Sequence, residues 1–282
     1  MNENITTVTT FHDIGLKTYG QRFIDSFAKN VDKKIKLLVY TEDCEPVNPD
    51  PEQIIVLDAK THLTKLNKFK AKWQGVPFAN GECPFPQRRP KDNHKKFKWD
   101  AVRFANKTFA VFDAVQKSRD WCVWMDADIV VHSEVTYQDF KNLLPNDAWI
   151  TYIGRGKKEK SWPECGFYGL NLNQKTCQEF ISEFESMYLE AEDGIFTLDE
   201  WHDSFIFGTL LRKYTHENQN VHDYAKDIFN KTAKTGGGGH PFINSDLGKY
   251  FDHLKGDRKK QGKSFAKDVN PNRTESYWRA ML

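Results

Sequence analysis

The stretch DWCVWMDADIVVHSEV, residues 120–135, constrains the fold of this chain more than any other. An apolar run at residues 123–125 leads to two aspartates one residue apart, Asp126 and Asp128, and apolar residues resume at 129–131. Continuous apolar runs of this kind are typical of strands buried on both faces. Burying one carboxylate without a partner is costly, and burying two side by side is more so. We therefore expect a positively charged partner beside them.

Strand-like runs and helical patterns alternate along the whole chain. Helical spacing of apolar residues indicates helices, and β-branched or continuous apolar runs indicate strands. This alternation predicts an α/β fold, a mostly parallel twisted sheet flanked by helices. Strands are expected at residues 5–11, 35–43, 53–58, 120–135, 148–153 and 166–172, and helices at residues 19–31, 97–117, 174–191 and 201–214.

The length of 282 residues suits one large domain or two small ones. We interpret residues 1–260 as a single domain that contains a long irregular loop at residues 75–96. The remaining residues, 261–282, read as a basic C-terminal tail that is partly disordered. Four consecutive glycines at residues 236–239 indicate either a flexible connector or a loop that closes over a ligand.

Charge is unevenly distributed, although the net charge is only +2 and does not require a nucleic-acid partner. Residues 60–103 contain twelve Lys and Arg against three acids, whereas residues 183–203 contain eight acids and no Lys or Arg. Such runs are commonly solvated faces, and the alternative is a phosphate-binding surface.

The cysteines and the N-terminus bear on location. Five cysteines without a CxxC pair indicate reduced thiols in a cytosolic compartment. The first residues lack the charged and apolar regions of a signal peptide, and no apolar run approaches the length of a membrane span. We therefore expect a cytoplasmic protein without a membrane span.

The pair Asp126 and Asp128 has three interpretations. The carboxylates could hold a hard divalent cation such as Mg²⁺ or Mn²⁺, which prefers oxygen ligands. They could instead form an acid/base pair for glycoside hydrolysis, or cap a turn. Their place at the carboxyl end of an expected parallel strand favours a ligand site, because open α/β sheets bind ligands there.

Three segments together resemble the GT-A-fold glycosyltransferases, above all the glycogenin-like retaining family, glycosyltransferase family 8. CVWMDADIVV resembles the metal-binding segment of that family. A first strand ending in Thr9-Thr10-Phe11, followed by Tyr19, resembles its N-terminal signature. HLKGDRK, residues 253–259, resembles its late H-x-x-G-x-x-K signature. The family continues with Lys-Pro-Trp where this chain has Lys260-Gln261, which suggests a divergent branch, of phage or bacterial origin.

The resemblance implies a metal and diphosphate site. Asp126, Asp128 and His253 would bind Mn²⁺ or Mg²⁺, and a nitrogen ligand favours Mn²⁺. Asp126 would also contact the nucleotide sugar. Gly256 would let the backbone approach the phosphates, and Lys259 would pair with them.

The resemblance also implies contacts with the donor. Thr9, Thr10 and Phe11 would meet the nucleotide base, although Phe11 could instead be a core residue. Lys98 and Arg103 would reach the donor phosphate or sugar, and the alternative for both is a solvated helix face. Residues 164–167 occupy a slot where the family has an Asn beside the donor sugar, so the sugar is left open. Asp203 would be a sugar-binding or catalytic carboxylate.

These residues predict a metal-dependent glycosyltransferase, a hexosyl- or pentosyltransferase. It would move a sugar from a nucleotide-sugar donor, a UDP-sugar above all, to an acceptor hydroxyl with retention. The acceptor, a glycan, a protein or modified DNA, stays open. The alternative is a metal-dependent nucleic-acid-binding protein or nuclease that uses the basic segment for phosphates. Glycosyl transfer and nucleic-acid binding would combine in an enzyme that glycosylates modified DNA bases. If a phage encodes the protein, it would act in the cytoplasm of the host.

Overall fold

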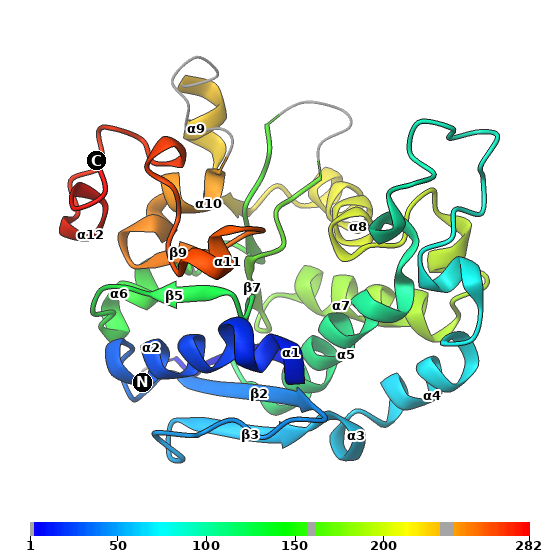
Figure 1. The fold of residues 1–282 in the computed structure, drawn as a ribbon, viewed down its shortest axis with the longest axis horizontal. Helices are drawn as coiled ribbons and strands as arrows, with labels where there is room; N and C mark the ends of the chain where they lie inside the picture. The colour runs from blue at the N-terminus through cyan, green and yellow to red at the C-terminus, as the bar shows by residue number, and fades with distance from the viewer. Residues whose placement is uncertain (1–2, 157–161, 232–239) are drawn as a thin grey trace.

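A seven-stranded sheet forms the centre of the computed structural model, which describes residues 3–156, 162–231 and 240–282. The strands lie in the order β3-β2-β1-β4-β7-β6-β8 (Figure 1). β7 runs antiparallel to its neighbours β4 and β6, and the other pairs are parallel. The expected fold class, a mostly parallel sheet flanked by helices, is confirmed. The strands are β1 (Ile5–His12), β2 (Lys36–Glu42), β3 (Ile54–Asp58), β4 (Trp121–Met125), β6 (Ile150–Tyr152), β7 (Phe167–Asn171) and β8 (Val221–Asp223).

Helices cover both faces of this sheet, and alternate strand residues contribute to two separate apolar cores. Cys122 and Trp124 of β4 pack with α4, α5, α7 and α8, whereas Trp121, Val123 and Met125 pack with α2 and α6. This division follows from the two-residue period of an extended strand. The helices are α1 (Asp13–Gly15), α2 (Gln21–Asn30), α3 (Ala59–His62), α4 (Thr64–Trp73), α5 (Ala101–Lys117), α6 (Tyr137–Asn142), α7 (Lys175–Leu189), α8 (Asp203–Glu217), α9 (Lys226–Lys231), α10 (Pro241–Asn244), α11 (Arg258–Gln261) and α12 (Ser276–Arg279).

A second, two-stranded sheet pairs β5 (Ile129–Val131) with β9 (Phe251–His253) in antiparallel register. The stretch expected as one strand is therefore two strands in two sheets, which corrects the sequence prediction. The break lies at the aspartates, where the Ile129 N–H donates to the Asp126 carbonyl at 3.1 Å and turns the chain. Residues 126–128 thus connect the large sheet to the small one.

Helix α5 begins at Ala101, four residues later than expected, because residues 96–99 form a short 3₁₀ helix, η3 (Lys96–Trp99). The Asp100 side chain caps α5 by accepting from the Arg103 N–H. As the spacing predicts, Phe109 and Phe112 lie on the buried stripe of this helix. The opposite face of α5 carries Arg103 and Lys107, which are four residues apart.

The loop at residues 75–96 is irregular apart from one 3₁₀ turn, η2 (Pro77–Asn80). Phe78 anchors it by packing edge-on against Phe196 and Trp201, with ring centroids 5.2 and 5.5 Å apart. Gly81 has φ of +97°, a left-handed conformation that favours glycine. The loop is therefore held against the α/β core.

Residues 261–282 pack against the rest of the protein, so the expected partial disorder of this tail is not observed. Trp278 is fully buried and donates to the Gly248 carbonyl at 2.6 Å. Tyr277 stacks on His132, with ring centroids 4.0 Å apart. The glycine run at residues 236–239 lies outside the described residues, and the division at residue 260 stays a prediction.

The cysteines and the helix lengths bear on the expected compartment. All five cysteines are free thiols, and four of them are buried. Across residues 3–156, 162–231 and 240–282, every helix is too short or too polar to span a lipid bilayer.

Candidate active site

Asp126 and Asp128 lie directly after β4, at the carboxyl end of the parallel pair β1 and β4. The Asp126 N–H donates to the Gly166 carbonyl at 2.9 Å, which ties the end of β4 to the segment before β7. Asp128 is buried and Asp126 is partly exposed. The expected position of the pair at a strand end is therefore correct.

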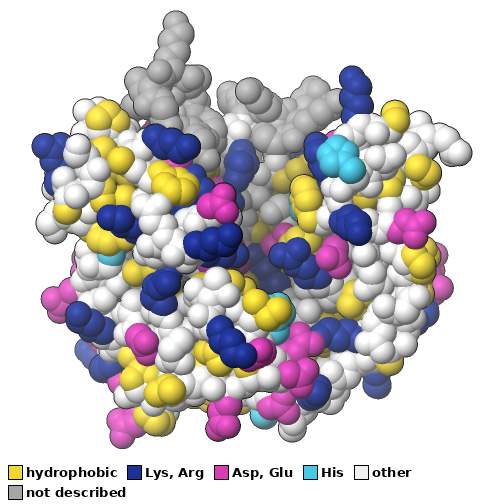
Figure 2. Space-filling view, viewed as in Figure 1, with side chains coloured by type: hydrophobic (Ala, Val, Ile, Leu, Met, Phe, Trp, Pro, Cys, Tyr) yellow, Lys and Arg dark blue, Asp and Glu magenta, His cyan; other side chains and the backbone are white. Residues whose placement is uncertain are grey.

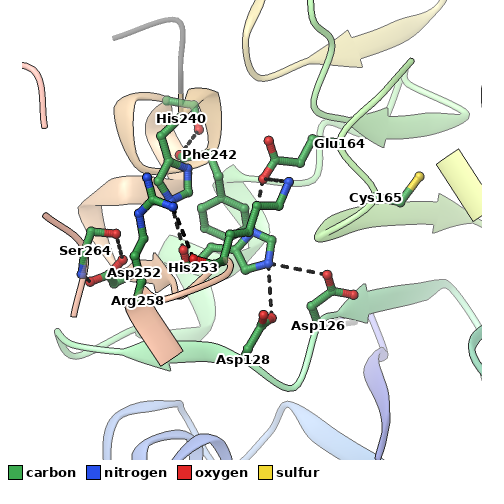
Figure 3. A network of polar contacts seen from close by, with 12 residues as sticks. Asp126, Asp128, Glu164, Cys165, His240, Phe242, Asp252, His253, Arg258 and Ser264 are labelled. Atoms are coloured by element: carbon green, nitrogen blue, oxygen red, sulfur yellow. Dashed lines mark hydrogen bonds and ion pairs between the residues drawn. The ribbon is translucent and has the colours of Figure 1, made fainter. Parts of the chain in front are cut away.

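His253 reaches the aspartates through the small sheet. β9 places His253 opposite Ile129, and the Leu254 N–H donates to the Asp128 carbonyl at 2.9 Å. The His253 Nε2 lies 3.1 Å from Asp128 Oδ1 and 3.4 Å from Asp126 Oδ2 (Figure 3). The two sequence segments that were expected to share a site are brought together.

These three side chains fit a divalent cation. One ligand atom from each of Asp126, Asp128 and His253 lies within 4.8 Å of the others. The His253 Nε2 is buried and has no hydrogen-bond partner among the described residues. Two carboxylates and one imidazole nitrogen form a donor set that Mn²⁺ and Mg²⁺ accept, and the nitrogen favours Mn²⁺.

The electrostatics keep the cluster charged. Burial raises the pKa of the Asp126 carboxyl, but Lys107 and His253 outweigh burial and hold that pKa below its usual range. His253 lowers the pKa of Asp128 in the same way. Burial lowers the pKa of His253, yet the neighbouring carboxylates, Asp128 first, raise it well above its ordinary value. The aspartates are therefore ionised and able to bind a cation.

Lys259 and Gly256 follow His253 in the chain. The Lys259 Nζ lies 3.0 Å from Asp128 Oδ2 and 4.6 Å from the centre of the Tyr19 ring. Gly256 has φ of +60° and open space around the position of a Cβ. The turn conformation thus favours glycine, and the backbone at Gly256 stays accessible.

Lys107 on α5 joins Asp126 to Asp203. Its Nζ lies 3.1 Å from Asp126 Oδ1 and 2.8 Å from Asp203 Oδ2, and it donates to the Cys165 carbonyl. Asp203 is a buried residue in the first turn of α8. Burial lowers the pKa of Lys107, but the two aspartates raise it well above the usual value, so the ammonium stays charged. Asp203 therefore belongs to the same charged cluster, and its role toward a sugar stays a prediction.

Glu164 contacts the other side of His253. Its Oε1 lies 3.1 Å from His253 Nδ1 and 2.7 Å from Lys255 Nζ, and its Oε2 accepts from Arg155 at 2.8 Å. The segment before β7 lies so close to His253 that residue 166 must be glycine. A methyl group at this position would overlap the His253 ring.

The end of β1 meets the site only in part. Thr10 and Phe11 line a small cavity of about 230 Å³ together with Asp128 and Lys259. Thr10 also donates through Oγ1 to the Tyr40 carbonyl at 2.8 Å. Thr9 is fully buried and lies outside this cavity. Phe11 also belongs to the apolar core, which confirms the core interpretation, and its contact with the nucleotide base stays a prediction.

Lys98 and Arg103 have different surroundings. Lys98 Nζ lies 3.0 Å from Asp92 and 2.8 Å from Glu200, with 14% of its side chain exposed. Arg103 is exposed and has no ion-pair partner within 4 Å in the described part of the chain. Arg103 lines the small cavity and Lys98 does not. Of these two candidates, only Arg103 lines the small cavity beside Asp126 and Asp128, and the donor contacts of both stay predictions.

A second cavity of about 1440 Å³ adjoins the small one. Figure 2 shows the hollow near the centre of the molecule, with Lys and Arg side chains around it. Rings of Phe97, Phe104, His202, Phe205 and Trp162 form a connected series along its lining. The two cavities share a wall made by Arg103, Phe104, Lys107 and Asp126.

The basic and acidic segments of the sequence face each other. Eight of the twelve basic side chains in residues 60–103 form ion pairs, and five of these pair with residues 183–203. The strong local charge excess is thus largely neutralised inside the molecule. These five side chains form six ion pairs, which join Lys65 to Glu185, Lys72 to Glu192, Arg88 and Arg89 to Asp199, and Arg89 and Lys98 to Glu200.

Lys107 and Glu164 are the site residues that sequence reasoning missed. Lys107 follows Arg103 by four residues, and this spacing places both on one helix face. That spacing was the available signal. For Glu164 no spacing pointed to His253, because 89 residues separate them.

A comparison with known protein families finds no match, and a comparison with curated protein sequences finds none. The fold is similar to the crystal structure of apo mouse xyloside xylosyltransferase 1, with TM-score 0.42, 11% identity and coverage of 78% of this chain and 84% of that chain. It is also similar to apo WbbM, a bifunctional glycosyltransferase, with TM-score 0.41, 12% identity and coverage of 80% of this chain and 39% of that chain. Similarity at this level carries no information on the site residues.

Proposed function

We propose that this protein is a metal-dependent glycosyltransferase. It transfers a hexose or pentose from a nucleotide-sugar donor, a UDP-sugar above all, to an acceptor hydroxyl with retention of configuration. The observation that carries this proposal is the cluster of Asp126, Asp128 and His253 with Lys259 beside it, at the carboxyl end of β1 and β4. The resemblance of the same segments to the glycogenin-like family supports it.

The small cavity fits the nucleotide diphosphate. Mn²⁺ or Mg²⁺ held by Asp126, Asp128 and His253 would neutralise charge on the diphosphate leaving group. Lys259 adds an ammonium on the same side, and the accessible backbone at Gly256 would let phosphate oxygens approach. Phe11 and Thr10 form the part of the wall where the base would lie.

The shared wall between the cavities fits the transferred sugar. Lys107 and Asp203 provide an ammonium and a carboxylate for sugar hydroxyls, because they lie 2.8 Å apart beside Asp126. Arg103 lies at the same wall, where it would reach the donor phosphate or sugar. The acceptor hydroxyl would enter through the large cavity, whose aromatic rings suit the apolar face of a sugar or a base.

A panel of nucleotide sugars tests the proposal. The protein is incubated with UDP-, GDP- and other nucleotide sugars in the presence of Mn²⁺, and the released nucleotide is measured. We expect release from one donor, lost on chelation of the metal. Release from none of them, together with no metal-dependent nucleotide binding, would contradict the proposal.

Asp128→Asn sharpens the test. The amide keeps the shape of the side chain but weakens a cation ligand, so we expect turnover below about one hundredth of wild type. Asp246→Asn is a matched control, because Asp246 is exposed and, within the described part of the chain, forms an ion pair with Lys249 alone. Unchanged turnover in Asp128→Asn would refute its role as a ligand.

The nucleic-acid alternative has less support. Its electrostatic basis was the segment at residues 60–103, and most of those cations pair with acids of the same chain. A transferase that acts on modified DNA bases would use both the metal site and the large cavity. Duplex DNA affinity that depends neither on salt nor on Lys and Arg changes at residues 88–98 would exclude that acceptor.

A further inference from the structure

The imidazole of His253 can serve the metal site in only one orientation. Nε2 faces the two aspartates, and Nδ1 faces Glu164 on the opposite side of the ring. With a cation bound between Asp126 and Asp128, Nδ1–H would donate to the Glu164 carboxylate and Nε2 would present its lone pair to the cation. Figure 3 shows these contacts converging on the ring from both sides.

Glu164 is itself fixed in place. Its side chain is 1% exposed, and Lys255 and Arg155 bind its two oxygens at 2.7 and 2.8 Å. Its N–H donates to the Ile153 carbonyl at 2.8 Å. Burial raises the pKa of the Glu164 carboxyl, but His253 and Lys255 outweigh it and hold that pKa well below its usual range. The group is therefore an ionised acceptor that cannot move easily.

We infer that Glu164 is a positioning residue for the metal site, which fixes the ring of His253 and raises the basicity of its Nε2. Carboxylates that accept from the second nitrogen of a metal-binding histidine act in this way. This inference rests on the proposed function, because it presupposes that His253 binds the cation. Gly166 belongs to the same arrangement, since it leaves the space that the ring occupies.

The role of Glu164 also explains a departure from the resembling family. Residues 164–167 replace a segment in which that family has an Asn beside the donor sugar. Here the carboxylate already faces His253, Lys255 and Arg155, so it is not free to bind a sugar hydroxyl. Recognition of the sugar then falls to Lys107 and Asp203.

Metal affinity without donor tests the inference. Mn²⁺ binding is measured by electron paramagnetic resonance and by calorimetry for wild type, Glu164→Ala and Glu164→Gln. We expect Glu164→Ala to weaken Mn²⁺ binding about 10- to 100-fold. Glu164→Gln should lose less, because its amide oxygen still accepts from Nδ1–H. Circular dichroism in the presence of a chelator checks the fold, and Glu164→Gln decides the question if Glu164→Ala does not fold.

Glu200→Gln is a matched control. Glu200 is a similarly buried carboxylate that contacts His202, Lys98 and Arg89, but it does not contact His253. Its substitution should leave Mn²⁺ affinity unchanged. Wild-type affinity in both Glu164 variants would overturn the inference and leave the proposed function intact. Wild-type protein that binds neither Mn²⁺ nor Mg²⁺ would overturn the metal-dependent function as well.

Discussion

Gly166 shows how little space the metal site leaves for change. Its Cα faces the His253 ring directly, and its carbonyl accepts from the Asp126 N–H. In Gly166→Ala the new methyl group would push the ring away from the aspartates. We expect Mn²⁺ affinity to fall at least about 10-fold while the protein stays folded. Calorimetric titration checks this.

Gly75→Ala is the control for Gly166→Ala. A Cβ at Gly75 meets nothing within 4 Å, so the same chemical change should leave the affinity as it is. An unaltered Mn²⁺ affinity in Gly166→Ala would mean that His253 is not held where the structure places it.

The ammonium of Lys107 balances the negative charge of two carboxylates, Asp126 and Asp203. In Lys107→Met, Asp126 and Asp203 lose the ammonium that lies between them, and we expect a loss of stability of about 3–5 kcal/mol together with loss of turnover. Urea unfolding and donor hydrolysis measure the two effects. Lys117→Met on the same helix removes an exposed pair with Asp113, which should change stability by less than about 1 kcal/mol. Equal stability of both variants would refute the bridging role of Lys107.

Some site residues could be assigned from the sequence and others could not. Asp126, Asp128 and His253 lie in short segments that resemble family signatures, so the sequence could predict that they lie together. Lys107 and Glu164 act through contacts made by folding, and a lysine on a helix has the same local pattern whether it is solvated or buried. Thr9 shows the opposite error, since it was expected at the nucleotide base but lies outside the cavity. Strand alternation turns its side chain to the face opposite that of Thr10.

At the scale of elements, two basic residues near the start of α5 differ in their roles. Lys98 is held in ion pairs, whereas Arg103 is a candidate for binding the donor. Lys98 bonds Asp92 and Glu200, so Lys98→Gln should lower stability by about 1–3 kcal/mol. Arg103 has no such partners within the described residues, so Arg103→Gln should change stability by less than about 0.5 kcal/mol and should weaken UDP binding. Urea unfolding and UDP titration with Mn²⁺ distinguish the two. The reverse result would restore Lys98 as the donor residue.

Most of the expected strands and helices agree with the structure because their apolar periodicity is strong, whereas α4, α6 and β8 were not predicted. The switch from β4 to β5 was not foreseen, since both strands have the composition of one continuous strand. Strands of three residues, such as β5, β6 and β9, contain too few positions for alternation to show. The change of sheet depends on a partner strand more than one hundred residues later.

At the scale of the whole molecule, His132 links acid stability to the C-terminal segment. Burial lowers the pKa of His132 to about 4, and the ring contacts Tyr277 and Trp278. Its Nε2 is 3.3 Å from the Gly248 carbonyl, and the nearby charges are Arg273 and Glu275. The folded protein therefore favours the neutral ring.

Stability should consequently fall as the pH decreases. Above pH about 6.5 the ring is neutral in both states, and between 6.5 and about 4 only the unfolded chain takes up the proton. We expect a loss of about 3 kcal/mol across this window. His132→Gln should flatten the curve, and urea unfolding at several pH values measures it. His240, whose pKa is lowered similarly, is present in both proteins, so the difference in slope reports His132. Parallel curves would contradict the assignment.

The α/β class followed from the alternation of strands and helices, but the order of the strands did not. The antiparallel course of β7 and the pairing of β5 with β9 depend on contacts between distant segments. No local pattern encodes these choices. The charged segments show the same limit, because only the fold reveals that they neutralise each other.

The pairing of β5 with β9 also sets the order of events during synthesis. The seven-stranded sheet can be assembled from residues up to Asp223, whereas His253 and Lys259 come later. A ribosome-bound chain that ends before β9 would therefore contain the aspartates and the central sheet without the His253 side chain that lies beside them. The cluster of Asp126, Asp128 and His253 would be complete only when β9 joins the small sheet, because that strand carries its third member.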